Sequence, residues 1–195
     1  MKLLLIGGFL GAGKTTVIRS ILTGIDEAGQ SAAIIENEIG ELGIDDRLLS
    51  GGKVQVTPLF GGCVCCQISG DLLNAVDQIR AELAPDWLIV EATGLAFLSE
   101  LRKLFEDFDA PVCSVAVVDI TRWARLYRAN PELMRSQLEG AEAVIVNKTD
   151  VKEPESAELV QLRALAGGDA ALIPSSPEDK STGALWEALR RSFGG

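Results

Sequence analysis

The chain has 195 residues, of which 47% are hydrophobic, and this is the size of one α/β domain with an ample core. Its 28 acidic and 18 basic residues give a net charge of −10, which argues against a nucleic-acid partner because such proteins present a basic surface. The chain contains no histidine, so histidine-based catalytic triads and histidine metal ligands are excluded.

Predicted strands and helices alternate along the chain. Apolar segments, several of them continuous runs, predict buried strands over Leu3–Gly7, Ala32–Glu36, Val54–Pro58, Trp87–Glu91, Val112–Asp119, Ala143–Asn147 and Ala171–Pro174. Helices are predicted over Lys14–Ala28, Gly70–Leu83, Leu98–Phe108, Thr121–Glu139, Ser156–Ala166 and Thr182–Ser192. This alternation predicts an α/β fold of the P-loop NTPase class, with a mostly parallel central sheet and helices on both faces. We expect a single domain over residues 1–195. No apolar run approaches the ~20 residues of a membrane span, so we also expect a cytoplasmic protein without a membrane partner.

The first predicted strand runs directly into the sequence GFLGAGKT at residues 8–15, which matches the phosphate-loop pattern G-x-x-x-x-G-K-[ST]. Glycines let backbone N–H groups point inward around a phosphate, and the N-terminus of the following helix adds positive potential. Lys14 is expected to reach the β- and γ-phosphates, and the Thr15 hydroxyl to bind Mg²⁺. A glycine-rich turn without a ligand is the alternative. The expected nucleotide ligands here are Gly8, Gly11, Ala12, Gly13, Lys14, Thr15 and Thr16.

An acidic, glycine-spaced segment follows at residues 36–45, with the sequence ENEIGELGID. It lies where a loop that senses the nucleotide would fall, and a solvated loop is the alternative interpretation. As a functional segment, it could supply a metal ligand through Glu36 or Glu41, and Glu38 could approach the nucleotide.

Three of the four cysteines, Cys63, Cys65 and Cys66, lie close together in a glycine-rich segment. Soft thiolates favour Zn²⁺, Cu⁺ or other thiophilic ions. Three ligands leave a tetrahedral shell incomplete, so a carboxylate, a water or a partner protein must complete it, which suits a transferable ion. The alternative is three small residues in a tight loop. Cys113 lies in a predicted strand and is expected to be a core residue.

Two acidic residues end neighbouring predicted strands. Glu91 is followed by Gly94 three positions later, and its carboxylate would reach Mg²⁺ directly or through water. The Gly94 N–H could contact the γ-phosphate and move after hydrolysis. Asp119 is a second candidate near this Mg²⁺. For both acids the alternative is a solvated residue at a strand end.

The sequence NKTD at residues 147–150 follows another predicted strand. The Asp150 carboxylate can accept hydrogen bonds from the ring N–H and the exocyclic amine of guanine, whereas adenine offers no such pair of donors. Lys148 would pack its stem along the base, and Asn147 would tie this segment to the phosphate loop. The alternative for Asp150 is a helix cap, and the alternative for the protein is an ATP-dependent kinase or transferase.

These motifs occur together in one order: the phosphate loop, ENEIGE at 36–41, GCVCC at 62–66, EATG at 91–94 and NKTD at 147–150. In this the sequence resembles the CobW group of P-loop GTPases over essentially its whole length. Relatives of that group are the nickel-maturation GTPases of urease and hydrogenase. The resemblance implies slow GTP hydrolysis coupled to binding and delivery of a metal ion. It implies metal ligands among Cys63, Cys65, Cys66, Glu41 and Glu36, and nucleotide ligands at the positions already named.

The sequence thus predicts a GTPase in which Lys14 and Glu91 serve catalysis and Thr15, Glu91 and Asp119 are candidates for Mg²⁺. Its cofactors would be GTP or GDP, Mg²⁺ and a transition metal, with Zn²⁺ expected before Co²⁺ or Ni²⁺. Its partner would be a client metalloprotein or a protein of a corrinoid system, and a homodimer is left open. Typical members carry a further C-terminal domain, which we expect to be absent here because the sequence stops at Gly195. The competing hypothesis is a nucleotide-binding regulatory module with a redox-active cysteine loop.

Overall fold

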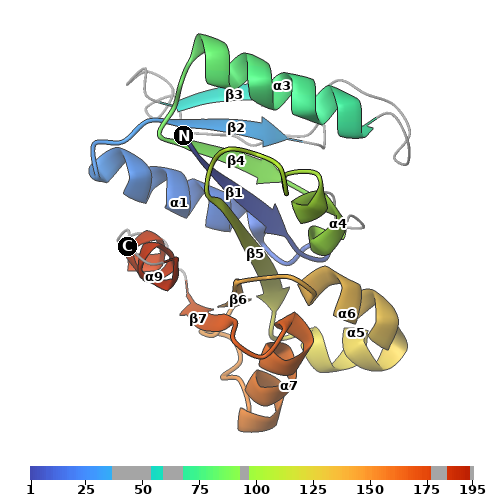
Figure 1. The fold of residues 1–195 in the computed structure, drawn as a ribbon. Coiled ribbons are helices and arrows are strands. Elements are labelled where there is room, and N and C mark those ends of the chain that lie inside the picture. The colour runs from blue at the N-terminus through green and yellow to red at the C-terminus, as the bar shows by residue number, and fades with distance from the viewer. Residues whose placement is uncertain (37–53, 59–67, 93–96, 177–183, 194–195) are drawn as a thin grey trace.

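A computed structural model describes residues 1–36, 54–58, 68–92, 97–176 and 184–193. Its centre is one seven-stranded sheet in the order β3-β2-β4-β1-β5-β6-β7, in which every neighbouring pair is parallel (Figure 1). The strands are β1 Lys2–Gly7, β2 Ala32–Glu36, β3 Val54–Pro58, β4 Trp87–Glu91, β5 Val112–Asp119, β6 Ala143–Asn147 and β7 Ala171–Ser175. The described helices are α1 Lys14–Glu27, α3 Ile68–Glu82, α4 Leu98–Lys103, α5 Trp123–Ala129, α6 Pro131–Leu138, α7 Ser156–Ala166 and α9 Ala184–Ser192. The predicted α/β class and all seven predicted strands are confirmed.

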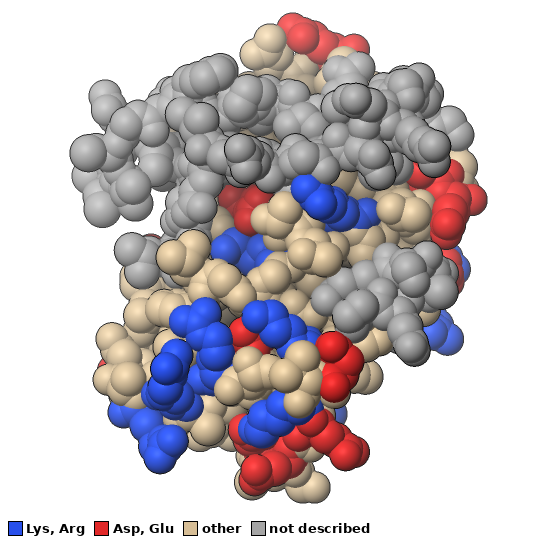
Figure 2. Space-filling model, turned by 180° about the vertical axis from the view of Figure 1, so that it is seen from behind, with Lys and Arg blue, Asp and Glu red and all other residues tan. Residues whose placement is uncertain are grey.

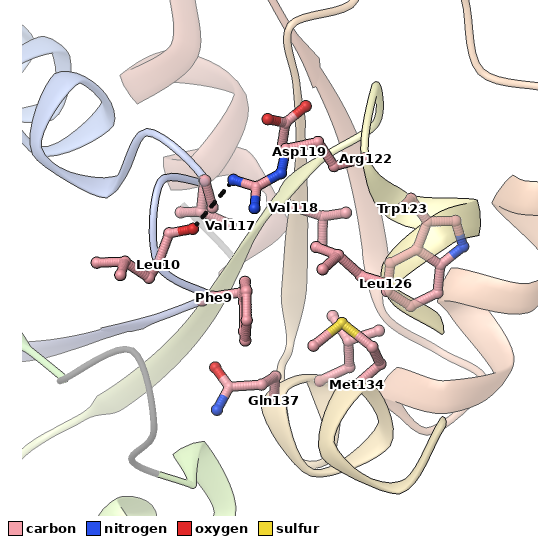
Figure 3. Close-up of a pocket in the computed structure, with 13 residues that line it drawn as sticks. Phe9, Leu10, Val117, Val118, Asp119, Arg122, Trp123, Leu126, Met134 and Gln137 are labelled. Carbon is pink, nitrogen blue, oxygen red and sulfur yellow. Dashed lines mark hydrogen bonds between the residues drawn. The ribbon is translucent and has the colours of Figure 1, made fainter. Parts of the chain in front are cut away.

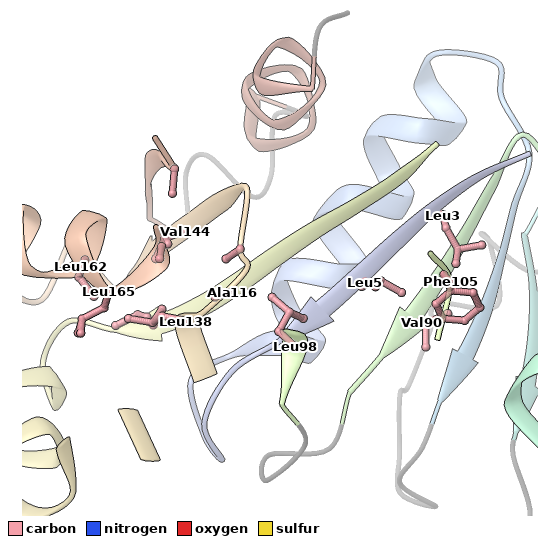
Figure 4. Close-up of a cluster of buried hydrophobic side chains, with 14 of the residues drawn as sticks. Leu3, Leu5, Val90, Leu98, Phe105, Ala116, Leu138, Val144, Leu162 and Leu165 are labelled. Carbon is pink, nitrogen blue, oxygen red and sulfur yellow. The ribbon is translucent and has the colours of Figure 1, made fainter. Parts of the chain in front are cut away.

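Side chains alternate between the two faces of the sheet, because successive residues of a strand point in opposite directions. In β1, Leu3 and Leu5 join the core beneath α3, α4, α6 and α7, and Figure 4 shows part of this cluster. Leu4 and Ile6 join the opposite core, which α1 and α9 cover. All four leucine and isoleucine side chains are fully buried, which explains why the strand reads as a continuous apolar run.

The predicted helix Thr121–Glu139 is wrong, because the structure has two helices there, α5 and α6. The break falls at Asn130, whose backbone leaves the helical region, with φ −152° and ψ 81°. Pro131 disfavours a helical conformation in the residue before it and is itself well suited to the first turn of a helix. The Asn130 side chain completes the new start by accepting a hydrogen bond from the Leu133 N–H at 3.1 Å.

The predicted helix Leu98–Phe108 is too long, since α4 ends at Lys103. Tighter turns follow, in which the N–H groups of Phe105 and Phe108 donate to carbonyls three residues earlier. These turns bring Phe105 into the core, where its ring packs edge-to-face on Phe108 with 5.7 Å between centroids. The free energy gained by burying the Phe105 ring therefore exceeds the free energy that continuing the helix would give.

The central position of β1 places the phosphate loop. β1 lies between β4 and β5, so the chain runs to one side of it through β2 and β3 and to the other side through β5, β6 and β7. In open parallel sheets, ligands bind beyond the carboxyl ends of the strands at such a reversal. The register pairs Ile6 with Glu91 and Asp119 with Asn147, so the predicted site residues lie along one edge of the sheet. Among the described helices, none combines the length and the apolar character that crossing a bilayer requires.

Gly24 allows α1 and α9 to approach each other. A Cβ atom added at Gly24 would lie 2.4 Å from the Trp186 Cβ, so Gly24→Ala is expected to lower the free energy of unfolding by about 1–3 kcal/mol despite the better helix propensity of alanine. Urea unfolding measures the change. Gly70→Ala, in the exposed first part of α3 where an added Cβ meets nothing within 4 Å, is the control and should raise stability by up to about 1 kcal/mol. Equal effects of the two substitutions would contradict the close packing.

Candidate functional site

The phosphate loop connects β1 to α1 in a conformation that only glycine adopts easily. Gly8, Gly11 and Gly13 have φ values of 143°, 77° and 94°. A Cβ at Gly8 would lie 2.4 Å from the Val117 carbonyl oxygen, and one at Gly13 would lie 2.3 Å from the Asn147 Nδ2. Backbone strain and lack of space thus both require glycine at positions 8 and 13. Such a loop before a helix N-terminus is suited to hold a phosphate through its N–H groups.

Lys14 begins α1 and is buried, with 8% of its surface exposed. Its ammonium group donates a hydrogen bond to the Gly8 carbonyl oxygen at 3.1 Å, and so turns back across the loop. Thr15 is partly buried and Thr16 is exposed, both in the first turn of α1. The structure therefore brings the expected ligands of residues 8–16 together in the phosphate loop and the first turn of α1, and their contacts with a nucleotide stay a prediction.

The phosphate loop is bound to the NKTD segment by a buried hydrogen bond. The Asn147 Nδ2 donates to the Ala12 carbonyl oxygen at 2.7 Å, and Asn147 is only 1% exposed. This is the tie between the two motifs that the sequence predicts. The next residue, Lys148, has a positive φ of 66°, and its ammonium group lies 3.4 Å from the Gly11 carbonyl oxygen. Asp150 is exposed, as a group that must meet a ligand would be.

Asp119 lies at the end of β5 with both carboxylate oxygens engaged. The Lys148 Nζ is 2.6 Å from its Oδ2, and the Thr121 hydroxyl and N–H donate to its Oδ1. Burial raises the pKa of Asp119, but the hydrogen bonds from Lys148 and Thr121 outweigh it, and the pKa falls below the ordinary value of 3.8. The stabilisation that this carboxylate gives is therefore present above pH 3.8 and is lost as the pH falls through the lowered folded-state pKa.

If Asp119 bound Mg²⁺, as the sequence analysis expects, the ion would have to displace Lys148 and Thr121 from the carboxylate oxygens. Glu91, the other candidate, ends β4 beside β1 and is partly buried. It therefore lies on the phosphate-loop side of the sheet, at the edge that the sequence predicts.

Arg122 is a site residue that the sequence analysis missed. Its Nη1 donates to the Leu10 carbonyl oxygen at 3.4 Å, and a Cβ at Gly11 would lie 3.0 Å from the same nitrogen (Figure 3). The signal that could have found it is its position three residues after the strand-end Asp119. Figure 2 shows Lys and Arg side chains gathered in the region of α5, which contains the exposed Arg125 and Arg128, although the chain as a whole is acidic.

An apolar hollow lies against the phosphate loop. The side chains of Phe9, Leu126 and Met134 converge on it from the loop, α5 and α6 (Figure 3). Phe9 also packs against the main core. The loop is thus anchored by apolar contact at Phe9 and by hydrogen bonding at Ala12, with Gly11 between these two points.

The end of β7 lies beside the NKTD segment and is hydrogen-bonded to it. The N–H and the hydroxyl of Thr149 both donate to the Ser175 carbonyl oxygen, at 3.3 and 3.1 Å. The Ser175 hydroxyl is fully buried and has no hydrogen-bond partner within the part of the chain that the structure describes. The two bonds from Thr149 fix the NKTD segment to β7, and the bond from Asn147 to Ala12 fixes it to the phosphate loop.

The expected transition-metal ligands lie largely outside the part of the chain that the structure describes. Cys63, Cys65, Cys66 and Glu41, together with Gly94, lie outside the described residues, and of Glu36 only the backbone at the end of β2 is described. Within residues 1–36, 54–58, 68–92, 97–176 and 184–193, no three or more acidic or cysteine residues are grouped so that they could hold a metal ion together. Cys113 is a free, buried thiol in β5, so its expected place in the core is confirmed.

The fold and this edge of the sheet define a nucleotide-binding protein of the P-loop GTPase class. The chain belongs to the CobW/HypB/UreG nucleotide-binding domain family, whose sequence pattern matches residues 2–168.

Among curated relatives, it is 33% identical over 159 residues to the zinc chaperone YjiA of Escherichia coli, covering 75% of this chain and 49% of that protein. It is 32% identical over 198 residues to the zinc chaperone YeiR of the same organism, covering 97% of this chain and 59% of that protein. The chain thus spans about half the length of the curated relatives it matches.

Among solved structures, the chain resembles the hydrogenase maturation factor HypB of Archaeoglobus fulgidus, with a TM-score of 0.71 and 17% identity over 100% of this chain and 91% of that one. HypB of Helicobacter pylori in complex with nickel gives a TM-score of 0.63 and 18% identity over 100% and 90%. At these identities the likeness concerns the fold, and it confirms the P-loop architecture.

Removing the tie between the two motifs is expected to weaken nucleotide binding as well as the fold. Asn147→Ala leaves the buried Ala12 carbonyl without its donor and should cost about 1–3 kcal/mol of unfolding free energy. Guanine nucleotide affinity should fall with it. Asn130→Ala is the matched control, since it removes the cap of α6 and should cost about 1 kcal/mol without changing affinity. Urea unfolding and calorimetric titration with GDP measure both quantities, and an equal affinity of the two variants would contradict the prediction.

Cys113 is expected to resist alkylation in the folded protein. Burial, with a smaller contribution from the negative charge of Glu142, raises the pKa of the Cys113 thiol to about 11, so it is neutral near pH 8. Iodoacetamide should modify it only after denaturation, as peptide mass spectrometry would show. Rapid labelling of Cys113 in the native protein would be the contrary result.

Proposed function

We propose that this chain binds GTP with Mg²⁺, hydrolyses it to GDP and phosphate, and couples this cycle to binding and delivering a transition-metal ion. The observation that carries the proposal is the buried hydrogen bond from Asn147 to the Ala12 carbonyl. This bond holds the NKTD segment, which we propose reads guanine, directly beside the phosphate loop, so that one guanine nucleotide could contact both segments. An ATP-dependent enzyme needs the phosphate loop but has no use for the NKTD segment.

Phosphoryl transfer needs positioning and neutralisation of charge more than covalent chemistry. Lys14, now bonded to the Gly8 carbonyl, would turn its ammonium group to the β- and γ-phosphates. The loop N–H groups would surround the β-phosphate, and the Gly94 N–H would contact the γ-phosphate. Because no arginine is assigned to the reacting phosphate, we expect slow intrinsic hydrolysis that a partner protein or a second copy would accelerate.

The oxygen atoms of Thr15 and Glu91 are donors of the kind that Mg²⁺ prefers, and both residues lie at the phosphate-loop edge of the sheet. They would hold the ion, which when bound neutralises charge on the phosphate oxygens. Glu91 would in addition orient groups around the γ-phosphate.

The transferred ion would be held by Cys63, Cys65 and Cys66, with Glu36 or Glu41 completing the shell. Thiolates favour zinc, and the curated relatives YjiA and YeiR are zinc chaperones, so Zn²⁺ is proposed before Co²⁺ or Ni²⁺. GTP and Mg²⁺ would order the segment 36–45 and the cysteine segment, and hydrolysis would release them. The recipient would be a client metalloprotein or a corrinoid-system protein. A cytoplasmic location and a homodimer remain predictions.

Base specificity is tested with Asp150. The wild type should bind GDP far more tightly than ADP, and Asp150→Asn should weaken GDP binding about tenfold to a hundredfold while improving binding of xanthosine diphosphate, because the amide can donate where the carboxylate could only accept. Calorimetry measures each affinity. The control is Asp169→Asn, an exposed aspartate at the other end of β7, which should leave all three affinities unchanged. No preference for GDP over ADP in the wild type would overturn the proposed GTPase.

Metal coupling is tested by comparing two nucleotide states. Zn²⁺ affinity should differ between the protein with GDP and the protein with a non-hydrolysable GTP analogue, and Cys65→Ser should abolish tight Zn²⁺ binding in both. Cys113→Ala, which removes the one buried core thiol that the structure describes, should keep it. Identical Zn²⁺ affinity in the two nucleotide states would remove the coupling, and failure to bind any thiophilic ion would favour a redox role for the cysteines.

A further inference from the structure

Asp119 is surrounded by donors from its own chain. Its side chain is 4% exposed, and Lys148 approaches Oδ2 at 2.6 Å. The other oxygen, Oδ1, accepts from the Thr121 hydroxyl at 2.5 Å and from the Thr121 N–H at 3.0 Å. These three bonds leave one lone-pair position, on Oδ2, and a divalent cation there would be repelled by the ammonium group that is already bound to the same oxygen. Asp119 is therefore built to hold a cationic side chain.

The side chain that Asp119 holds belongs to the guanine-reading segment. Lys148 has φ 66°, a left-handed conformation that is strained for any residue with a Cβ. Its N–H donates to the Asn147 Oδ1 at 2.9 Å, which fixes the backbone end. Its ammonium group is fixed at the other end by Asp119 and reaches the Gly11 carbonyl oxygen at 3.4 Å. The aliphatic stem between these two anchors consequently has a defined course across the site.

We propose that Asp119 is a positioning residue for the guanine base, which acts by holding Lys148 so that its stem forms one face of the base pocket, and that it does not bind Mg²⁺. This inference rests on the proposed GTP-binding function and extends the guanine-reading set from residues 147–150 to the end of β5. Thr121 belongs to the same arrangement, because its two donors keep the carboxylate turned toward Lys148.

The ionisation of the carboxylate is consistent with this role. The pKa of Asp119 is lowered, since the bonds from Lys148 and Thr121 outweigh the effect of burial, and Asp119 is negatively charged at neutral pH. The Lys148 side chain, 38% exposed, therefore meets a permanent charge and keeps its place before any nucleotide binds.

Asp119→Asn, measured with and without Mg²⁺, distinguishes a role in holding Lys148 from a role in binding Mg²⁺. The amide keeps the size of the side chain but loses its charge, so Lys148 should be held less well. GDP affinity is expected to fall about tenfold, and by the same factor in EDTA and in Mg²⁺, because the base is contacted in both. Inosine diphosphate, which lacks the exocyclic amine that Asp150 would read, should lose the same factor. Calorimetric titrations of the full chain with GDP in EDTA, with GDP in Mg²⁺ and with inosine diphosphate measure the three changes.

Two sets of variants control the experiment. Thr121→Val removes the hydroxyl bond without changing the shape of the side chain and should weaken GDP binding, whereas Thr121→Ser should lose less because it keeps the hydroxyl. Glu142→Gln breaks the ion pair between Glu142 and Arg102, which lies at the opposite end of the sheet and has the same 2.6 Å length as the pair between Asp119 and Lys148. This variant should leave GDP affinity unchanged. Thermal unfolding of each nucleotide-free variant shows whether the fold is kept.

The outcomes are distinguishable from failure of the proposed function. If the wild type prefers GDP over ADP but Asp119→Asn binds GDP in EDTA as the wild type does, the inference is overturned. A shift confined to the Mg²⁺ concentration needed for GTP binding would overturn it also and would return Asp119 to the metal. The inference would also be contradicted if Asp119→Asn changed the ratio of GDP affinity to inosine diphosphate affinity. A loss of GDP affinity in Glu142→Gln as large as that in Asp119→Asn would contradict it as well. If the wild type shows no guanine preference, it is the proposed function that fails.

Discussion

The hydrogen bond between the Asn147 amide and the Ala12 carbonyl is the constraint on which the site depends. It joins two segments that are 135 positions apart in the sequence and is buried from solvent. An alternative partner for either atom would leave the other unpaired in the interior, at a cost of about 1–3 kcal/mol. The spacing between the phosphate loop and the NKTD segment is thereby set by the folded chain, before the proposed nucleotide arrives. Pre-formed spacing of this kind lowers the conformational cost of binding.

The parallel sheet makes that bond reachable. Each strand of a parallel sheet ends at the same edge, so the carboxyl ends of β1, β4, β5, β6 and β7 lie along one edge although the chain between them crosses the whole molecule. The two cores hold β1 from both sides, and the phosphate loop is further fixed by Phe9 against α5 and α6. The glycines of the loop adopt their positive φ values between rigid neighbours. Packing in the two cores thus stabilises the unusual backbone conformation of the loop.

The sequence predicted what depends on local pattern and missed what depends on contacts between distant side chains. The strands were predictable because doubly covered strands are continuous apolar runs, as in β1 and β6. The break between α5 and α6 was missed because an apolar periodicity runs through Asn130 and Pro131, although the proline itself gave the signal. The pairing of Asp119 with Lys148 could not be predicted. It joins side chains 29 residues apart through a left-handed backbone conformation, which no spacing of residues reveals.

The contact between α1 and α9 provides the protein with an internal optical probe. Trp186 of α9 packs edge-to-face on Trp87 of β4, with 4.8 Å between ring centroids, and lies against Gly24 of α1. Since α1 starts at Lys14, any shift of that helix when phosphates bind would alter the surroundings of these indoles. The third tryptophan, Trp123, lies beside the phosphate loop at the start of α5. Intrinsic fluorescence therefore samples both sides of the loop without an attached dye.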